Sequence, residues 1–462
     1  MARIIREGKL QPQSNSGGIT RITVGGFKSI VQEQSIEIKP LTILAGANSS
    51  GKSSIMQPLL LLKQTLESTY DPGSLLLNGP NVKFTEVDQL LSHVDNGQPI
   101  NIFHVGMEVG DQAVVTTYFT REKNKGFDVI ETAYKSNGPN YRVYTGMPQN
   151  EAQIIANIAL RTTHLGSSKL LLDMAKPGER WEVSFVQSRC FLVPALRPEG
   201  PEVAEADDIF VSIVASMPGE ALVENSIHQT LHLPGLRGSP ERDYPVTATG
   251  PTFPGTFELY AASIIEHWQL DNAKQKLKKL FSDLTRLALT NKVIARRRNA
   301  TAIELLVNRF LQGDKEDMVS IADVGIGVSQ ALPVVVALHT ANPGQLVYIE
   351  QPEIHLHPRA QYAMAEVLAN AAKEGKRLVI ETHSSILLLG IQTLVAEGKL
   401  PPELVKLHWF TQQEDGSTKI DSADLDERGA YGDWAEDFDD VALYSEGRFL
   451  DAQSRTRGQA GE

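Results

Sequence analysis

Residues 41–54 read LTILAGANSSGKSS, a short apolar run that leads into Gly46, four further residues, and then Gly51, Lys52 and Ser53. The apolar run at 41–44 is typical of a buried strand, and KSSIMQPLLLLKQTLES at 52–68 is typical of a helix. Between them lies the spacing GxxxxGK[ST], in which a glycine-rich loop leads into a helix N-terminus. Backbone N–H groups and the positive helix end then point at one place, as a triphosphate requires. The stretch predicts a nucleotide site, with an ordinary strand–turn–helix as the alternative.

The residues of this loop have separate expected roles. Gly46 and Gly51 allow positive φ and a close approach of the backbone to phosphate. Lys52 is expected to reach the β- and γ-phosphates of ATP, and the Ser53 hydroxyl to ligate Mg²⁺. Pro58 is expected to kink or end the helix. The predicted nucleotide-binding residues are Gly46, Asn48, Ser49, Ser50, Gly51, Lys52, Ser53 and Ser54.

Composition excludes several classes of protein. The chain has 462 residues, 41 % of them hydrophobic, so it can bury a full core. Its formal net charge is −12, so contact with nucleic acid would need a local basic patch. The single cysteine, Cys190, excludes an intrachain disulfide and a cysteine-based metal cluster. Apolar runs such as ALPVVVAL at 331–338 are shorter than the ~20 residues that span a bilayer, and no signal peptide is evident. We expect a cytoplasmic protein with no membrane contact.

Two further strands are predicted to end beside the phosphate loop. LVYIEQPEIHLHP at 346–358 reads as a buried strand that ends at Glu350, followed by a helix from about Pro358. A carboxylate at that strand end can hold Mg²⁺ together with Ser53. RLVIETHSS at 377–385 reads as another buried strand, and His383 just past its end can contact a γ-phosphate.

A second glycine-rich helix start precedes both strands. In DVGIGVSQALPVVVAL at 323–338, Gly325, Gly327 and Ser329 lead into an apolar helix with exposed N–H groups. A glycine-rich turn before a core helix is the alternative interpretation.

Taken in order, these motifs resemble the ABC-type ATPases of the RecF, SMC and OLD (overcoming lysogenization defect) group. The resemblance rests on GFKSI at 26–30 as the N-terminal strand region, GANSSGKSS at 46–54 as Walker A, GVSQ at 327–330 as the signature, IEQPEIHLHP at 349–358 as Walker B with the D-loop, and ETHS at 381–384 as the switch histidine. It implies an α/β fold: a P-loop ABC-type ATPase head, with a mixed sheet flanked by helices and an inserted helical or mixed domain. It covers roughly residues 20–68 and 319–395.

The same resemblance implies a site shared between two chains. In this group two heads sandwich two nucleotides, and the signature serine of one head reaches the γ-phosphate held by the other. Ser329 would then face Lys52 of a second copy. A lone head would have an incomplete site, so the expected partner is the chain itself, as an ATP-dependent dimer or a higher oligomer.

One position departs from the group's pattern. The residue after the Walker B acid is usually a glutamate that orients the attacking water, and here it is Gln351. An amide cannot accept that proton, so either hydrolysis is slow or another carboxylate such as Glu353 serves. The predicted catalytic residues are Glu350, Gln351, Glu353 and His383, with Mg²⁺ on Ser53 and Glu350. His355 and His357 beside Glu353 allow a metal site, but a role in shaping the dimer seam is favoured.

Composition and motif positions divide the chain into five parts. We expect a flexible N-terminal extension at 1–20, the N-terminal half of the head with Walker A and antiparallel strands at 20–147, an inserted, mostly helical region at 148–318, the C-terminal half of the head at 319–420, and an acidic C-terminal extension at 421–462. Long coiled-coil arms are not expected, because no heptad repeat of useful length is present.

Two charged segments are candidate contact surfaces. Residues 274–298 carry nine basic side chains against one acid, Asp283. The candidate nucleic-acid or partner patch within them is Lys292, Arg296, Arg297 and Arg298, with a solvated helix face as the simpler interpretation. The stretch 421–446 carries ten acids with Trp434 and Phe438, and is read as a solvated cap or a dock for a basic neighbour.

A fused nuclease is not expected. Only 79 residues follow His383, and the DxD pair of Asp437 and Asp439 has no upstream glutamate motif for a Toprim fold. The favoured hypothesis is therefore a slow ATPase that oligomerises and regulates a separate effector, a nuclease or toxin, in bacterial anti-phage defence. One alternative is a DNA-repair or maintenance ATPase that binds DNA directly. Another is an assembly scaffold stabilised by ATP.

Overall fold

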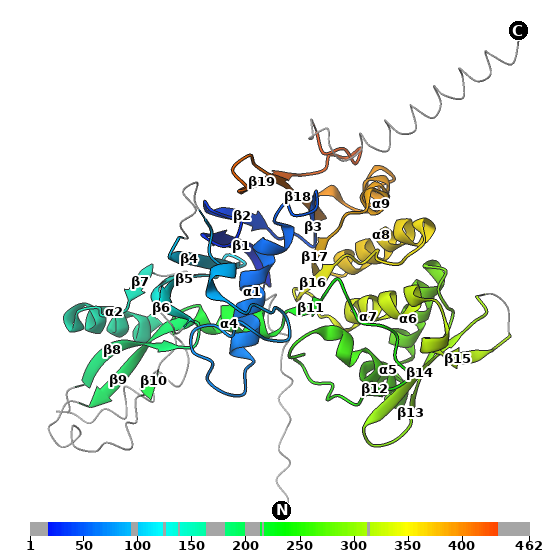
Figure 1. Ribbon diagram of the computed structural model, residues 1–462, viewed down its shortest axis with the longest axis horizontal. Coiled ribbons are helices and arrows are strands. Elements are labelled where there is room, and N and C mark those ends of the chain that lie inside the picture. Colours follow the sequence, from blue (N-terminus) through cyan, green and yellow to red (C-terminus); the bar gives the residue numbers. More distant parts are fainter. Residues whose placement is uncertain are drawn as a thin grey trace, which may run out of the picture.

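The computed structural model describes residues 17–93, 100–122, 126–136, 139–162, 181–198, 213–214, 217–311 and 315–432. Two large sheets organise these residues, with helix α1 (Lys52–Leu66) between them (Figure 1). The expected flexible extension at 1–20 lies mostly outside the described residues, as do Trp434, Asp437, Phe438 and Asp439 of the acidic segment.

The central sheet is parallel except at one edge. In spatial order its strands are β11 (Leu231–Leu233), β16 (Leu346–Glu350), β17 (Arg377–Glu381), β3 (Leu41–Gly46), β18 (Val405–Gln412) and β19 (Thr418–Ala423). Only β19 runs antiparallel to its neighbour. The phosphate-loop strand β3 thus lies between β17 and β18, and β16 is one strand farther away.

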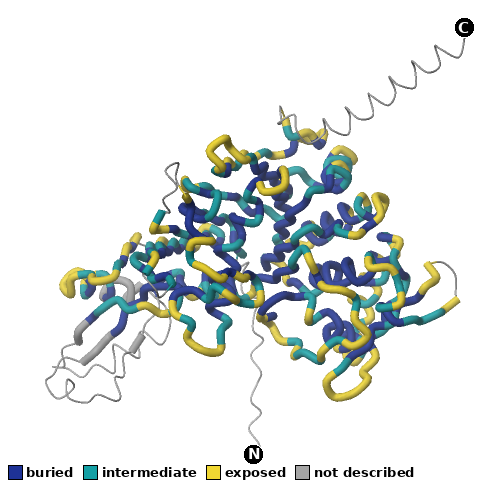
Figure 2. The backbone as a smooth tube through the Cα atoms, in the orientation of Figure 1, coloured by how far each residue is buried: buried dark blue, intermediate teal, exposed yellow. Residues whose placement is uncertain are grey.

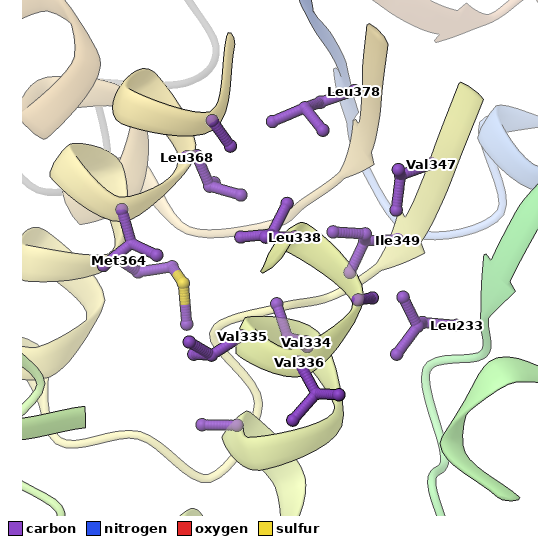
Figure 3. Packing of buried hydrophobic residues seen from close by; sticks show 14 of the residues in the cluster. Leu233, Val334, Val335, Val336, Leu338, Val347, Ile349, Met364, Leu368 and Leu378 are labelled. Carbon is purple, nitrogen blue, oxygen red and sulfur yellow. The ribbon is translucent and has the colours of Figure 1, made fainter. Parts of the chain in front are cut away.

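Successive residues of the central strands enter different cores, because side chains of a strand alternate between the two faces of its sheet. Val347 and Ile349 of β16 join a core formed with α7 (Ile326–Thr340), whereas Leu346 and Tyr348 join the core around α1. Figure 3 shows the first core, in which side chains of α7 pack beside those of β16 and β11. Helices α8 (Pro358–Lys373) and α9 (Ser385–Ala396) complete that layer.

The second sheet is antiparallel and covers the other side of α1. In spatial order it consists of β2 (Gln34–Glu37), β1 (Ile19–Gly25), β4 (Ile102–Val109), β5 (Ala113–Glu122), β6 (Gly126–Ser136) and β7 (Tyr141–Tyr144). Its apolar face, α1 and the near face of the parallel sheet share one core. The antiparallel strands predicted within 20–147 are therefore present. Figure 2 shows the buried backbone concentrated between these layers.

Helix α1 continues past Pro58 to Leu66, so the proline does not end it. Nearly every residue of α1 is buried. Packing of this kind outweighs the ~3 kcal/mol that a proline costs inside a helix.

The region 148–318, expected to be mostly helical, contains more strand than predicted. Its elements are α2 (Gln149–Thr162), β8 (Trp181–Ser188), β9 (Phe191–Pro198), β10 (Ile213–Val214), α4 (Glu220–His228), β11, β12 (Tyr244–Pro245), η3 (Phe257–Tyr260), α5 (Ala261–Leu270), α6 (Lys274–Arg286), β13 (Val293–Arg297), β14 (Ala302–Asn308) and the start of β15 (Met318–Ser320). Moreover, β11 is a strand of the central sheet and not of an insertion. Short strands such as β11 carry too few residues to show an alternating pattern.

The remaining short elements are η1 (Val87–Gln89), η4 (Ile321–Asp323) and η5 (Pro402–Leu404). No helix among the described residues is both long and apolar enough to cross a membrane.

Candidate nucleotide-binding site

The loop from Gly46 to Ser53 joins β3 to α1 in the geometry of a phosphate-binding loop. Gly46 has φ 144° and Gly51 has φ 93°, values that side chains with a Cβ rarely adopt. A Cβ on Gly46 would also lie 2.3 Å from the carbonyl oxygen of Phe410. The loop exposes Asn48 and Ser49, while Ser50 is buried and Ser54 lies within the first turn of α1.

The Lys52 side chain folds over the loop. Its Nζ donates hydrogen bonds to the carbonyl oxygens of Gly46 at 3.0 Å and of Ala47 at 2.6 Å. Burial lowers the pKa of Lys52, and the charge of Glu381 partly opposes that shift. The ammonium is thus held at the mouth of the loop, where it can meet phosphate oxygens.

His383 lies on the same side of the loop as Lys52. A pocket of about 410 Å³ is lined by Gly46, Ala47, Asn48, His383 and residues 409–412 of β18. Burial and the Lys52 charge lower the pKa of His383, so at neutral pH the imidazole is uncharged. The structure therefore brings together the loop and the predicted switch histidine.

Two glutamates end neighbouring strands beside the loop. In the sheet register Glu350 pairs with Glu381, and Glu381 pairs with Leu44 of β3. The Ser53 hydroxyl lies 2.9 Å and 3.0 Å from the two carboxylate oxygens of Glu381. The carboxylate in contact with Ser53 is therefore that of Glu381, whereas the prediction named Glu350.

Glu350 makes hydrogen bonds toward β11, and it also interacts with the Tyr348 hydroxyl, which contacts Glu381. Oε1 of Glu350 lies 3.0 Å from Nε2 of His232, and its Oε2 accepts from the Gly235 N–H at 3.0 Å. Burial alone would raise the pKa of Glu350, but these hydrogen bonds and nearby positive charge lower it overall. The pKa of Glu381 is raised by burial and by the Glu350 charge, so the two carboxylates are shifted in opposite directions.

The predicted residues after Glu350 are held by the loop that follows β11. Buried Arg237 donates to the Glu350 and Gln351 carbonyl oxygens, each at 3.0 Å, and Gln351 has φ 46°. Burial lowers the pKa of Arg237 to about 10. Glu353 accepts from the Thr382 hydroxyl at 2.7 Å and from the His383 N–H at 3.1 Å. In this arrangement Glu353 fixes the segment that carries His383.

The predicted signature residues lie at the start of α7, away from the pocket that the phosphate loop and His383 line. Gly325 caps that helix and is exposed, whereas Ser329 is buried and donates to the Ile326 carbonyl oxygen at 2.8 Å. Ser329 instead lines a separate cavity of about 170 Å³ together with Arg237 and Glu258. Within one chain the signature and the phosphate loop thus form two distinct surfaces.

Each cation of the candidate basic patch contacts a carboxylate. Lys292 pairs with Glu316 at 2.6 Å, Arg296 with Glu304 at 2.5 Å, and Arg297 with Glu266. Arg298 lies 3.4 Å from Asp243 and from Glu304. These pairs reduce the local positive charge that phosphate groups would meet.

The two histidines of the D-loop have backbone roles. His355 adopts φ 60°, and the His357 side chain accepts the Arg359 N–H at 3.3 Å as the N-cap of α8. Among the described residues no group of three or more His, Cys, Asp or Glu side chains is arranged to hold a metal ion.

Sequence reasoning missed three members of the site, namely Glu381, His232 and Tyr348. Glu381 stands inside the quoted ETHS motif, but only the position of β17 next to β3 reveals its contact with Ser53. His232 lies on a strand of three residues, too short for a pattern to be recognised. Tyr348 looks like any buried strand residue, yet its hydroxyl donates to Glu381 at 2.8 Å.

Comparison with known proteins agrees with this geometry. Residues 18–159 match the family model described as an AAA ATPase domain. Residues 253–389 match a second model, described as an AAA domain, putative AbiEii toxin, type IV TA system. Both halves of the nucleotide site thus match AAA-type domains. None of the curated proteins searched matches the chain.

The similar solved structures include SMC head domains. The SMC head domain from Thermotoga maritima is 12 % identical, with a TM-score of 0.39 over 87 % of this chain and 98 % of that one. An Smc head with an extended coiled coil, bound to the C-terminal domain of ScpA and derived from Pyrococcus furiosus, is 12 % identical, with a TM-score of 0.45 over 88 % of this chain and 96 % of that one. The predicted fold class, a P-loop α/β head whose mixed sheet is flanked by helices, is confirmed.

Proposed function

We propose that this chain is an ATPase that binds Mg²⁺·ATP at the Gly46–Ser53 loop, pairs with a second copy and hydrolyses the nucleotide slowly. The observation that carries the proposal is a pocket of about 410 Å³ that the loop and His383 line together, with the Lys52 ammonium bound to the loop carbonyl oxygens of Gly46 and Ala47. An N-terminal helix end, a lysine and a neutral imidazole are together suited to a triphosphate.

The donor set beside the loop fits Mg²⁺. Ser53 offers a hydroxyl oxygen and Glu381 a carboxylate within 3.0 Å of it, and hard oxygen ligands of this kind are those that Mg²⁺ prefers. When bound, the ion supplies charge neutralisation of the β- and γ-phosphates. Lys52 would hold the same phosphates, and the backbone N–H groups of the loop would orient them.

Slow turnover follows from Gln351. Its amide can orient a water molecule but cannot take the proton that hydrolysis releases. Glu353 is not exposed to an attacking water, because Thr382 and the His383 backbone occupy its Oε1, and its Oε2, which has no hydrogen-bond partner among the described residues, is buried. The bound ATP would therefore persist long enough to act as an assembly signal.

The second copy completes the site. The exposed N-terminus of α7 carries Gly325 and lies apart from the pocket of its own chain. A helix N-terminus attracts anions, so the surface is suited to the γ-phosphate held by another copy. Assembly would then depend on ATP, and ATP-dependent assembly can control a partner.

The biological role we propose is regulation of a separate effector, a nuclease or toxin, in anti-phage defence. One matched family model is described as an AAA domain and a putative toxin of a type IV TA system, which links domains of this kind to such systems. Direct DNA binding through Arg296, Arg297 and Arg298 is less favoured, because each of these side chains faces a carboxylate. The scaffold alternative shares the ATP-dependent assembly but needs no turnover.

The decisive experiment is the native mass of the purified chain, measured by light scattering without nucleotide, with ADP and with Mg²⁺·ATP. The native mass of wild type should increase with Mg²⁺·ATP and should not increase with ADP or without nucleotide. Gly325→Asp should not, because its carboxylate would face the incoming phosphate. This variant should fold normally, since a Cβ at Gly325 would meet no atom within 4 Å and φ is −60°. An unchanged mass for wild type in all three conditions would refute the proposal.

Co-expression with neighbouring genes extends this test to the effector. A protein that co-purifies with the chain and leaves it when ATP is added would support regulation. Turnover is tested by Gln351→Glu, which restores a proton acceptor and should raise the hydrolysis rate by about 10²-fold. An unchanged rate would show that Gln351 does not limit hydrolysis.

A further inference from the structure

The Ser53 hydroxyl points at a carboxylate that the motif pattern does not assign. Both carboxylate oxygens of Glu381 lie within hydrogen-bond distance of the Ser53 Oγ, at 2.9 Å and 3.0 Å. Only 6 % of Glu381 is exposed, so this contact lies beneath the loop and not on the surface. The Lys52 charge acts on the same carboxylate.

Glu381 is fixed from a second side by Tyr348. The Tyr348 hydroxyl donates to Oε2 of Glu381 at 2.8 Å. The Tyr348 side chain is fully buried, and its ring stacks on His232 with centroids 5.4 Å apart and an interplanar angle of 9°. A buried, doubly hydrogen-bonded carboxylate keeps its orientation, as a metal ligand must.

Glu350 lies one strand farther from the loop than Glu381 does, and it hydrogen-bonds to groups on and after β11. Neighbouring strands are about 4.8 Å apart, so the backbone of Glu350 lies about 10 Å from β3 and that of Glu381 about 5 Å. His232 and the Gly235 N–H occupy the two oxygens of Glu350. His232 is itself held, with Nδ1 3.1 Å from Oδ1 of Asn81.

We propose that Glu381 is the carboxylate that, with Ser53, holds the Mg²⁺ of bound Mg²⁺·ATP, and that Glu350 is instead engaged by His232 and the Gly235 N–H. The inference rests on the proposed function and names a ligand within that site. Mg²⁺ in nucleotide sites is commonly held by one or two carboxylates together with substrate phosphates, so one carboxylate beside Ser53 is sufficient.

The test is equilibrium binding of a fluorescent ATP analogue with Mg²⁺ and, separately, with EDTA. Wild type should bind more tightly with Mg²⁺. In Glu381→Gln the ratio of the affinity with Mg²⁺ to the affinity with EDTA should be at least tenfold lower than in wild type. In EDTA it should bind as tightly as wild type or more tightly, because a negative charge near the phosphates has been removed. A misfolded variant would lose binding in both conditions, which separates the two causes.

Glu220→Gln is the matched control. Glu220 is 6 % exposed, as Glu381 is, but it lies on α4 and accepts the Met217 N–H. Its Mg²⁺ enhancement should equal that of wild type. Tyr348→Phe, which removes one hydrogen bond from Glu381, should show an intermediate loss.

Two outcomes would overturn different statements. If wild type binds the analogue in neither condition, the proposed function itself fails. If wild type binds it and Glu381→Gln retains the full Mg²⁺ enhancement while Glu350→Gln loses it, the Mg²⁺ ligand is Glu350 and this inference is wrong.

Discussion

The phosphate-loop helix is anchored by a buried ion pair whose removal has a calculable effect. Lys63 of α1 is 0 % exposed and pairs with Glu67, which is 7 % exposed. Lys63 also donates to the Phe253 carbonyl oxygen at 3.2 Å, and Glu67 accepts the Gly255 N–H at 3.0 Å. The pair therefore joins α1 to the segment before η3. Glu67→Gln removes the negative charge and leaves the ammonium buried without its counter-charge.

The expected loss of unfolding free energy has an upper limit. Breaking a buried pair costs about 3–5 kcal/mol. The protein can instead deprotonate Lys63, at about 1.36 kcal/mol for each pH unit below the ordinary pKa of 10.5. The cost of deprotonating Lys63 therefore limits the loss of unfolding free energy to about 5 kcal/mol at pH 7 and to about 2 kcal/mol at pH 9. Burial lowers the pKa of Lys63 in the folded state, and the loss of Glu67 lowers it further. A lowered lysine pKa destabilises the fold at low pH, and the deficit disappears as the pH rises toward 10.5.

Urea unfolding of wild type and Glu67→Gln at pH 7 and pH 9 measures this effect. The unfolding free energy of Glu67→Gln should be lower than that of wild type by about 3–5 kcal/mol at pH 7 and by at most about 2 kcal/mol at pH 9. The double variant Lys63→Met with Glu67→Gln should recover most of the loss, because no buried charge remains. Glu397→Gln, whose partner Lys399 is 63 % exposed, should behave like wild type. A Glu67→Gln variant as stable as wild type at pH 7 would show that the Lys63–Glu67 pair does not stabilise the fold.

Three further predictions follow from the same structure. Lys52→Ala should abolish binding of a fluorescent ATP analogue without lowering the melting temperature, because burial already disfavours the Lys52 charge. Leu338→Ala should lower the urea-derived unfolding free energy by about 3 kcal/mol, because the side chain is 1 % exposed and its removal leaves a cavity. Arg297→Ala should lower the melting temperature more than Lys292→Ala does, because Glu266 is 10 % exposed and Glu316 is 55 % exposed.

The elements closest to the phosphate loop were predictable from the sequence for a physical reason. Strand β3 is buried on both faces and therefore reads as a mostly apolar run, with Thr42 as its one polar side chain. The glycines after it mark backbone conformations that other residues avoid, and Pro358 marks the first turn of α8. Signals of this kind depend only on neighbouring residues in the sequence, and the strand, the loop and the helix start lie at the positions that these residues predict.

The network around the loop was not predictable, because it depends on which strands become neighbours. Glu350 and Glu381 both end strands, and the sequence does not say that β17 is the neighbour of β3. His232 reaches Glu350 from a strand that is 118 residues away along the chain. Partners at such separations are set by topology alone.

Charge patterns were the least informative part of the sequence. Arg296, Arg297 and Arg298 form a basic run, but their counter-charges come from Glu266, Glu304 and Asp243. Each partner lies on another element or loop. A run of cations in sequence therefore does not by itself indicate a positive surface.

If two chains share each nucleotide site, two inactive variants should restore activity to each other when they are mixed. Lys52→Ala disables the phosphate loop and Gly325→Asp disables the signature, so each variant alone should release no phosphate from ATP. In an equal mixture half of the dimers contain both variants, and each such dimer has one intact site. The mixture should therefore recover about one quarter of wild-type hydrolysis. No recovery on mixing, with both variants folded, would contradict a site shared between chains.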